Sequence, residues 1–222
     1  MNYAFDFTPV IQGFPELLLG CIGTLGLAAG GMAIAIAIGV GGVMLRRSRI
    51  VLLRWPVVAF VELIRNTPFL VQIYFIFFAL PFVGIRLNPT VTALIALGIN
   101  GGAYAIEIIR GGVESIHKGQ IDAGLALGFR RKQVFWLVVL IPALRAVYPS
   151  LTSQFILLTL TTSIASAISA YELTSVAGII ESNSFRSFEV YGTVTILYLA
   201  MSSLLMLGFR QISTRYLAYP TR

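Results

Sequence analysis

The chain has 222 residues, of which 57% are hydrophobic and only 11% are charged. Soluble globular domains carry charge on roughly 25% of their residues, so this sequence has too few charged side chains to cover a water-facing particle of its size. Its formal net charge of +7 does not indicate nucleic-acid binding, because the basic residues lie in short segments between apolar runs rather than on one polar face.

The first half of the chain contains three apolar runs, and a membrane-spanning helix needs about 20 mostly apolar residues. We expect the first span over Leu17–Leu45, where frequent glycine and alanine would let helices approach closely. In the next run, Trp55–Pro81, the segment Asn66-Thr67-Pro68 disfavours helix. The pattern therefore predicts a short interfacial helix, a break and a second span over Phe69–Leu80. A third span is predicted over Pro89–Ile109.

The second half begins with a long polar segment, Gly111–Gln133. The apolar run after it contains Pro142 and Pro149, which remove backbone donors, so we expect the fourth span over Ser150–Ile168. Residues 171–187 are predicted to form a short helix and a loop. The fifth span is expected over Phe188–Phe209. The fold class is therefore an all-α, polytopic membrane bundle of about five spans.

The distribution of lysine and arginine predicts the orientation of the bundle, since basic residues are enriched in cytoplasmic loops. With five spans, only Arg86 and Arg186 fall on one side of the membrane. The other side holds Arg46, Arg47, Arg49, Arg54, Arg65, Arg110, Lys118, Arg130, Arg131, Lys132, Arg145, Arg210, Arg215 and Arg222. We therefore expect the N-terminus outside and the C-terminus in the cytoplasm.

Charged and hydroxyl side chains near or inside the spans are candidate functional residues. Two acid–base pairs are spaced i, i+3 on a helix face, Glu62 with Arg65 and Glu107 with Arg110. Each pair could be a structural ion pair or could transmit strain, and the sequence leaves both open. Candidates for lining a substrate path are Gln72, Thr159, Thr162, Ser163 and Ser166. The hydroxyls could equally satisfy the backbone of their own helix.

The polar segment around residues 119–140 has a pattern of its own. It predicts two short helices joined at Gly128, because glycine readily takes the positive φ that ends a helix and starts a new direction. Arg130, Arg131 and Lys132 would keep the second helix at the cytoplasmic surface. Two short helices at an angle form a compact projection that could dock into a groove on a soluble partner.

This segment resembles the EAA loop of ABC-importer permeases, with Asp122-Ala123-Gly124 as the triplet and Gly128 at the expected spacing. Ala103–Gln120 and Glu62–Gln72 resemble two signatures of the polar and opine amino-acid branch of that family. The resemblance covers roughly residues 54–178. Asp122 and Gly124 stand where the family usually has glutamate and alanine, and Thr161 stands where the branch often has aspartate or asparagine. These departures favour one half of a heterodimer.

The resemblance implies a single permease domain over residues 1–222 that forms a translocation path by alternating access in a bacterial inner membrane. Its implied partners are a second permease, an ATPase dimer, an extracellular or periplasmic amino-acid-binding protein and membrane lipid. ATP and Mg²⁺ would bind the ATPase partners, since the chain lacks the Gly-x-x-x-x-Gly-Lys-Ser/Thr phosphate loop. The residues implied to couple to the ATPase are Gly119, Asp122, Ala123, Gly124, Leu127, Gly128 and Arg130.

Two other functions compete with this interpretation. A structural subunit of a respiratory or energy-coupling complex predicts buried histidine or carboxylate relays within the spans, and the one histidine, His117, lies in a loop. A membrane-embedded enzyme needs a nucleophile and a base, or a metal set, facing one cavity. His117 and the single cysteine, Cys21, are far apart in sequence and fall on different predicted elements. We therefore expect a non-enzymatic subunit that binds no metal or cofactor itself. The amino acid carried stays open among histidine, arginine, lysine, glutamine, glutamate and opines.

Overall fold

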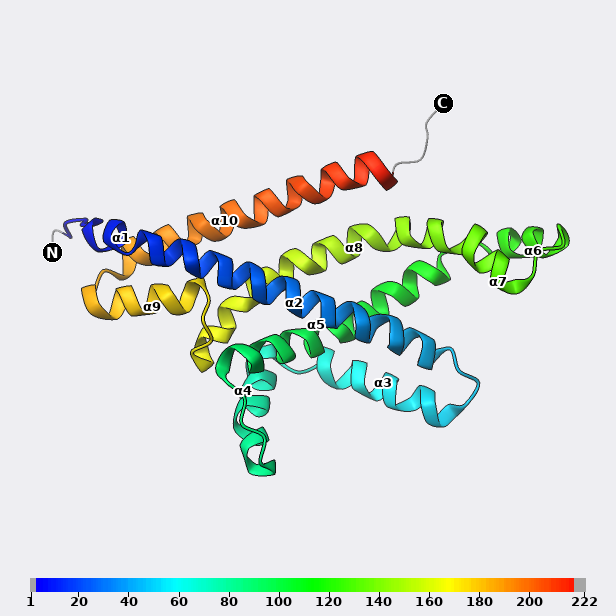
Figure 1. The fold of residues 1–222 in the computed structure, drawn as a ribbon, viewed down its shortest axis with the longest axis horizontal. Helices are drawn as coiled ribbons and strands as arrows, with labels where there is room; N and C mark the ends of the chain where they lie inside the picture. The colour runs from blue at the N-terminus through cyan, green and yellow to red at the C-terminus, as the bar shows by residue number, and fades with distance from the viewer. Residues whose placement is uncertain (1–2, 218–222) are drawn as a thin grey trace.

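The computed structural model describes residues 3–217, and every regular element within that range is a helix. Figure 1 shows long helices running in roughly one direction, with shorter ones at the two ends of the bundle. The elements are α1 (Thr8–Gln12), α2 (Phe14–Arg46), α3 (Val51–Arg65), α4 (Phe69–Ala79), η1 (Leu80–Val83), α5 (Pro89–Glu114), α6 (Lys118–Ala126), α7 (Arg131–Val134), η2 (Phe135–Val139), α8 (Leu140–Thr161), η3 (Thr162–Ile168), α9 (Leu173–Ser184), α10 (Ser187–Ile212) and η4 (Ser213–Leu217).

Four helical stretches in the described chain are long and apolar enough to cross a membrane: Phe14–Arg46, Pro89–Glu114, Arg131–Ile168 and Ser187–Leu217. A fifth arises if the bent pair Val51–Arg65 and Phe69–Val83 counts as one span. The all-helical bundle of about five spans is thus confirmed. The predicted first, third and fifth spans lie within the observed helices.

The predicted fourth span was wrong at its start, because the helix begins at Arg131 rather than at Ser150 and continues through both prolines. Pro142 follows the π-helical segment η2, a kind of irregularity that commonly accompanies a bend. Pro149 lies inside α8, and its carbonyl accepts hydrogen bonds from the hydroxyls of Thr152 (2.9 Å) and Ser153 (3.0 Å). These bonds do not replace the backbone donor that Pro149 removes, which would serve the carbonyl one turn earlier, but membrane helices tolerate proline, and α8 stays unbroken here.

The break at residues 66–68 is a turn of 110° between α3 and α4, larger than a simple interruption. In Figure 1, α4 runs across the direction of the long helices. Gln72 holds the turn together, because its amide nitrogen donates to the carbonyl of Ile64 (2.7 Å) and to the hydroxyl of Thr67 (2.8 Å). Its amide oxygen accepts from Asn100 of α5 (2.9 Å), so the bend is fixed to the core.

The core of the bundle is the close pairing of α2 with α5. A Cβ atom placed on Gly98 would lie 2.5 Å from Ile34, and one placed on Gly102 would lie 2.7 Å from Ile38. From the other helix, a Cβ atom on Gly39 would lie 2.8 Å from the Cβ of Ala105. Only glycine fits at these contacts, so the two backbones approach as closely as small residues allow in membrane helix pairs.

The two ends of the bundle are different in construction. At one end the first described residues lie beside α1 and α9, while α6 and α7 project from the opposite end (Figure 1). At the first end, the buried carboxylate of Glu189 accepts from the hydroxyl of Tyr3 (2.5 Å) and the backbone N–H of Asp6 (2.9 Å). Arg186 donates to the carbonyl of Ala4 (2.9 Å), so the N-terminal segment is fastened to the start of α10.

Candidate functional site

Helix α6 has a defined start and a defined end. At its start, Nδ1 of His117 accepts from the backbone N–H of Gly119 (3.1 Å), which satisfies one of the free donors of the first turn. At its end, Gly128 has φ of +83°, as expected. The N–H of Gly128 donates to Leu125 (3.0 Å) and that of Phe129 to Gly124 (3.2 Å), the hydrogen-bond pair of a Schellman turn.

The predicted second short helix after Gly128 is not a separate element. Helix α7 begins at Arg131 and continues through η2 into α8, so the turn connects α6 directly to a membrane span. The side chain of Gln133 accepts from the N–H of Arg130 (2.8 Å) and stabilises this start. Gly124 is buried, and a Cβ atom there would lie 3.2 Å from Val134. The projection is therefore one helix folded back on the root of the next span.

The outer surface of α6 is exposed, and its inner surface contacts α7 and η2. Gly119, Asp122, Ala123 and Arg130 are exposed, and the apolar side chain of Leu127 is 76% exposed at the tip. A hollow of about 310 Å³ lies on the inner side, between Ile121 of α6, Val113 of α5 and Arg47, which follows α2. Movement of α6 would therefore act first on α7 and η2, which it contacts, and through them on the span that continues into α8.

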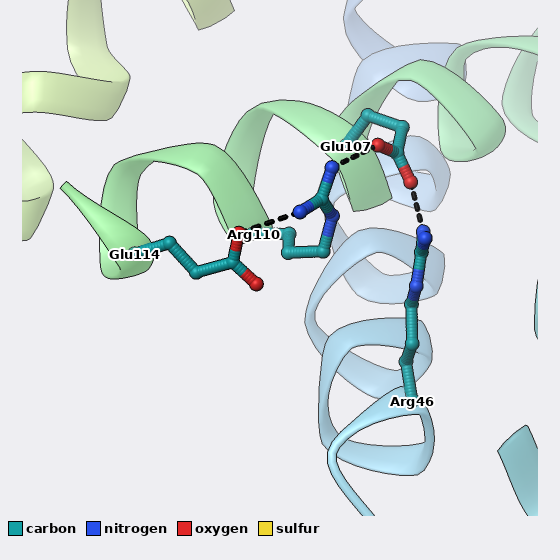
Figure 2. Close-up of polar contacts among 4 residues, drawn as sticks. All are labelled: Arg46, Glu107, Arg110 and Glu114. Atoms are coloured by element: carbon teal, nitrogen blue, oxygen red, sulfur yellow. Dashed lines mark hydrogen bonds and ion pairs between the residues drawn. The ribbon is translucent and has the colours of Figure 1, made fainter.

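A network of four charged residues joins α2 to α5 near this end of the bundle (Figure 2). Glu107 binds both Arg46 of α2 and Arg110 of its own helix, the latter at 2.6 Å. Arg110 also binds Glu114 at 2.5 Å. The predicted Glu107–Arg110 pair is thus confirmed, and it extends to a second helix that the i, i+3 spacing could not indicate.

The predicted Glu62–Arg65 pair is not among the ion pairs of residues 3–217. The Glu62 carboxylate accepts instead from the side-chain amide of Asn66 (3.0 Å), one turn later at the end of α3. The Arg65 guanidinium lies over the ring of Tyr104 in α5, 5.4 Å from its centre. Arg65 reaches this aromatic face because α3 packs against α5, a contact that spacing within one helix does not predict.

The hydroxyls that we expected to line a substrate path are bonded to their own helix. Thr159 donates to Phe155 (2.9 Å) and Thr162 to Thr159 (2.7 Å), and both side chains are fully buried. Ser163 donates to the carbonyl of Leu160 (2.8 Å), and Ser166 to that of Ser163 (2.6 Å). The amide of Gln72 is occupied at the α3–α4 turn. The structure thus favours the backbone-satisfying alternative for this set.

A polar face that the sequence analysis missed lies one to two turns earlier on α8. Ser150, Ser153 and Gln154 line a hollow of about 390 Å³ together with Pro149 and Leu157. Gln154 is only 8% exposed, and its amide makes no hydrogen bond to any residue that the structure describes. The spacing of these three polar residues, at i, i+3 and i+4, indicates a shared helix face. The sequence placed them at the predicted start of a span, where polar residues are common, and so their common face was missed.

Glu172 is a second residue whose importance the sequence did not indicate. Its carboxylate is fully buried and caps α9, accepting from the N–H groups of Thr174 (2.9 Å) and Ser175 (2.6 Å). Tyr198 of α10 donates to it as well (2.9 Å), and burial raises the pKa of the Glu172 carboxyl. Because all three contacts fix α9, this acid is part of the scaffold. An acidic residue directly before a helix was the signal.

Comparison with known proteins agrees with this geometry. The family of binding-protein-dependent transport system inner membrane components matches residues 31–218. The glutamine transport system permease protein GlnP of Escherichia coli (strain K12) is 36% identical over 213 residues, which cover 95% of this chain and 97% of the relative. The octopine transport system permease protein OccM of Rhizobium radiobacter is 34% identical over 207 residues, covering 89% and 84%.

Two solved structures share the fold. A crystal structure of an amino acid ABC transporter with histidines contains a chain that matches with a TM-score of 0.90 at 29% identity, covering 96% of this chain and 100% of the other. A methionine ABC transporter in an inward-facing conformation matches with a TM-score of 0.73 at 22% identity, covering 94% and 99%, and shows the fold alone. Nothing in these comparisons favours a respiratory or energy-coupling subunit. The chain belongs to the family of inner membrane permease components of binding-protein-dependent ABC importers.

Proposed function

We propose that this chain is the permease subunit of an ATP-driven importer for polar amino acids. Support comes from relatives named for glutamine and octopine transport and from a structural neighbour described as an amino acid transporter. The whole chain acts as one permease domain, with α1 and α9 on the outside and α6 in the cytoplasm. This orientation agrees with the excess of lysine and arginine toward the α6 end.

The coupling element is α6 with its Gly128 turn, and this geometry carries the proposal. The helix projects from the end of the bundle, exposes Asp122 and Leu127 outward, and rests inward on α7 and η2, at the start of the span that continues into α8. An ATPase subunit receives the outer surface, so that Gly119, Asp122, Ala123, Leu127 and Arg130 face the partner while Gly124 and Gly128 shape the turn. ATP and Mg²⁺ bind the ATPase dimer, where hydrolysis takes place.

The substrate path follows the polar face of α8 formed by Ser150, Ser153 and Gln154. Gln154 is almost buried as a residue, but its amide keeps some exposure and makes no internal hydrogen bond in the described chain, so the amide is suited to recognise a polar solute, because an unpaired amide in a membrane is costly. One permease supplies half of the path, and a second permease supplies the other half. An extracellular or periplasmic binding protein delivers the amino acid.

We favour a heterodimer over a homodimer for the permease pair. Asp122, Gly124 and Thr161 depart from the family pattern, as expected if the two halves have diverged. Two relatives from Bacillus subtilis (strain 168), described as probable glutamine ABC transporter permease proteins GlnP and GlnM, are 38% and 31% identical to this chain. Two such proteins in one organism are consistent with a pair of unlike subunits.

Co-expression with candidate ATPase, permease and binding-protein subunits tests the proposal. We expect the ATPase to co-purify with this chain, and we expect vesicles containing the assembly to take up a polar amino acid only with ATP and the binding protein. Gln154→Leu should lower uptake while leaving the assembly intact, and Thr161→Val, on the same helix, is the matched control. Isolation of the chain without an ATPase, under conditions that preserve the permease pair, would contradict the proposal.

A further inference from the structure

An open apolar groove runs along the bundle between α2 and α3, with α5 as its floor. Its volume is about 460 Å³, within the roughly 300–1,000 Å³ of small-molecule pockets. It is lined by Gly41 and Leu45 of α2, Pro56 and Phe60 of α3, and Ile99 and Ile106 of α5. The groove exists partly because Gly41 has no side chain, and a Cβ atom added there would meet nothing within 4 Å.

One end of this groove leads to a cluster of arginines. Helix α2 ends one residue after Leu45, and the connection to α3 carries Arg49, while Arg54 lies three residues before the groove residue Val57, on the same face of α3. Both arginines are exposed, and neither takes part in an ion pair within residues 3–217. Arg46, by contrast, is bound to Glu107. Two positive charges without acidic partners in the described chain therefore stand at the point where α2 and α3 leave the membrane.

We propose that this groove binds an anionic phospholipid, with one acyl chain along the apolar wall and the phosphate held by Arg49 and Arg54. The lining from Ile38 to Leu45 extends for roughly 10 Å along α2, at 1.5 Å per helical residue, so it covers a substantial part of an acyl chain. Basic residues at the membrane surface attract anionic headgroups. A neutral lipid would fill the apolar groove but leave both charges without a partner.

The occupant is a lipid because the two parts of the site coincide with the two parts of a bilayer leaflet. The apolar lining lies on helices of membrane-spanning character, and the arginines lie where α2 ends and α3 begins. A second permease packed on this face would cover the apolar wall, but it would match the two arginines only if it supplied acidic groups in the same place. Lipid binding here does not depend on which solute is carried, so its test is separate from that of the proposed function.

Two variants test the site, using the chain with the subunits that co-purify with it. The assembly is equilibrated in nanodiscs of equal parts phosphatidylglycerol and phosphatidylcholine, transferred to detergent, and analysed by native mass spectrometry. We expect phosphatidylglycerol to be retained over phosphatidylcholine by about tenfold. Gly41→Leu should fill the groove and abolish retention of both lipids. The double variant Arg49→Gln/Arg54→Gln should abolish the preference for phosphatidylglycerol.

The matched control is Gly26→Leu, because Gly26 lies on the same helix, has nothing within 4 Å of an added Cβ atom and does not line the groove. It should retain phosphatidylglycerol like the unaltered chain. Unchanged retention in Gly41→Leu, or an unchanged lipid preference in the double arginine variant, would overturn the proposal. A Gly41→Leu assembly that loses its second permease, with no lipid bound to the unaltered chain, would show instead that a subunit covers the groove.

Discussion

The α2–α5 pair and the α6 projection represent two different ways of using glycine. In the pair, Gly98 and Gly102 are surrounded by side chains of the facing helix, and an added Cβ atom would clash within 2.7 Å. In the projection, Gly128 has nothing within 4 Å, and glycine is favoured there by its φ of +83°. Gly98 and Gly102 let two helices touch, and Gly128 lets the chain change direction at the end of α6.

This difference separates the part of the molecule that must stay rigid from the part that can transmit movement. The α2–α5 contact is closely packed along much of its length, whereas α6 is held by one turn and by contacts on its inner side. Regions with few buried contacts have the lowest cost of local rearrangement. Substitutions in the pair should therefore affect folding, and substitutions in the projection should affect coupling.

The largest effect is expected for Gly102→Leu. The new side chain would collide with Ile38 in the close contact of the pair, at or above the upper end of the roughly 1–3 kcal/mol that overpacking costs. We expect little monodisperse protein after detergent extraction, as measured by size-exclusion chromatography. Gly26→Leu, on the same pair of helices but in open space, should behave like the unaltered chain. Equal yields for the two variants would show that the pair is not closely packed.

The next effect is expected for Gly128→Val, which forces a β-branched residue into positive φ at a cost of about 1–2 kcal/mol. Membrane insertion should persist, while ATP-driven uptake in vesicles should fall at least tenfold. Gly128→Asn should retain more uptake, because asparagine tolerates this conformation better. Normal uptake by the valine variant would count against the turn as the coupling element.

A smaller effect is expected for Glu107→Gln, which leaves Arg46 and Arg110 without their shared carboxylate. The Glu107 side chain is 20% exposed, so we expect a loss of about 1 kcal/mol, measured as a lower melting temperature of the purified assembly. Glu114→Gln is the control, since Glu114 is 58% exposed and an exposed pair contributes little. Equal shifts in melting temperature for both variants would show that Glu107 stabilises the assembly no more than an exposed carboxylate does.

The smallest effect is expected for Asp122→Lys on the exposed surface of α6. Reversing one exposed charge should weaken ATPase co-purification by a few fold and leave the stability of the chain unchanged. Gln120→Lys provides the comparison, because residues two apart do not share a helix face. If both lysines act alike, the effect comes from net charge rather than from the docking surface.

Sequence reasoning succeeded where one local pattern decides the structure. Continuous apolar runs predicted α2, α5 and α10, and the spacing of Gly128 predicted the turn after α6. It failed at Pro149, because a membrane helix tolerates an internal proline, and α8 continues unbroken through it. Residue type alone could not distinguish the roles of Gln72 and Gln154. The amide of Gln72 hydrogen-bonds within the bundle, whereas that of Gln154 makes no hydrogen bond in the described chain.

The central claim is that α6 contacts an ATPase partner, and site-directed photo-crosslinking tests it most directly. In a Cys21→Ser background, Leu127→Cys supplies a single exposed thiol for a benzophenone label at the tip of α6. Ile179→Cys, 59% exposed on α9 at the other end of the bundle, is the control. We predict that the label at residue 127 crosslinks to the ATPase and the label at residue 179 does not. Crosslinking to the ATPase from residue 179 alone, or from neither position in an assembly with ATPase activity, would contradict the account.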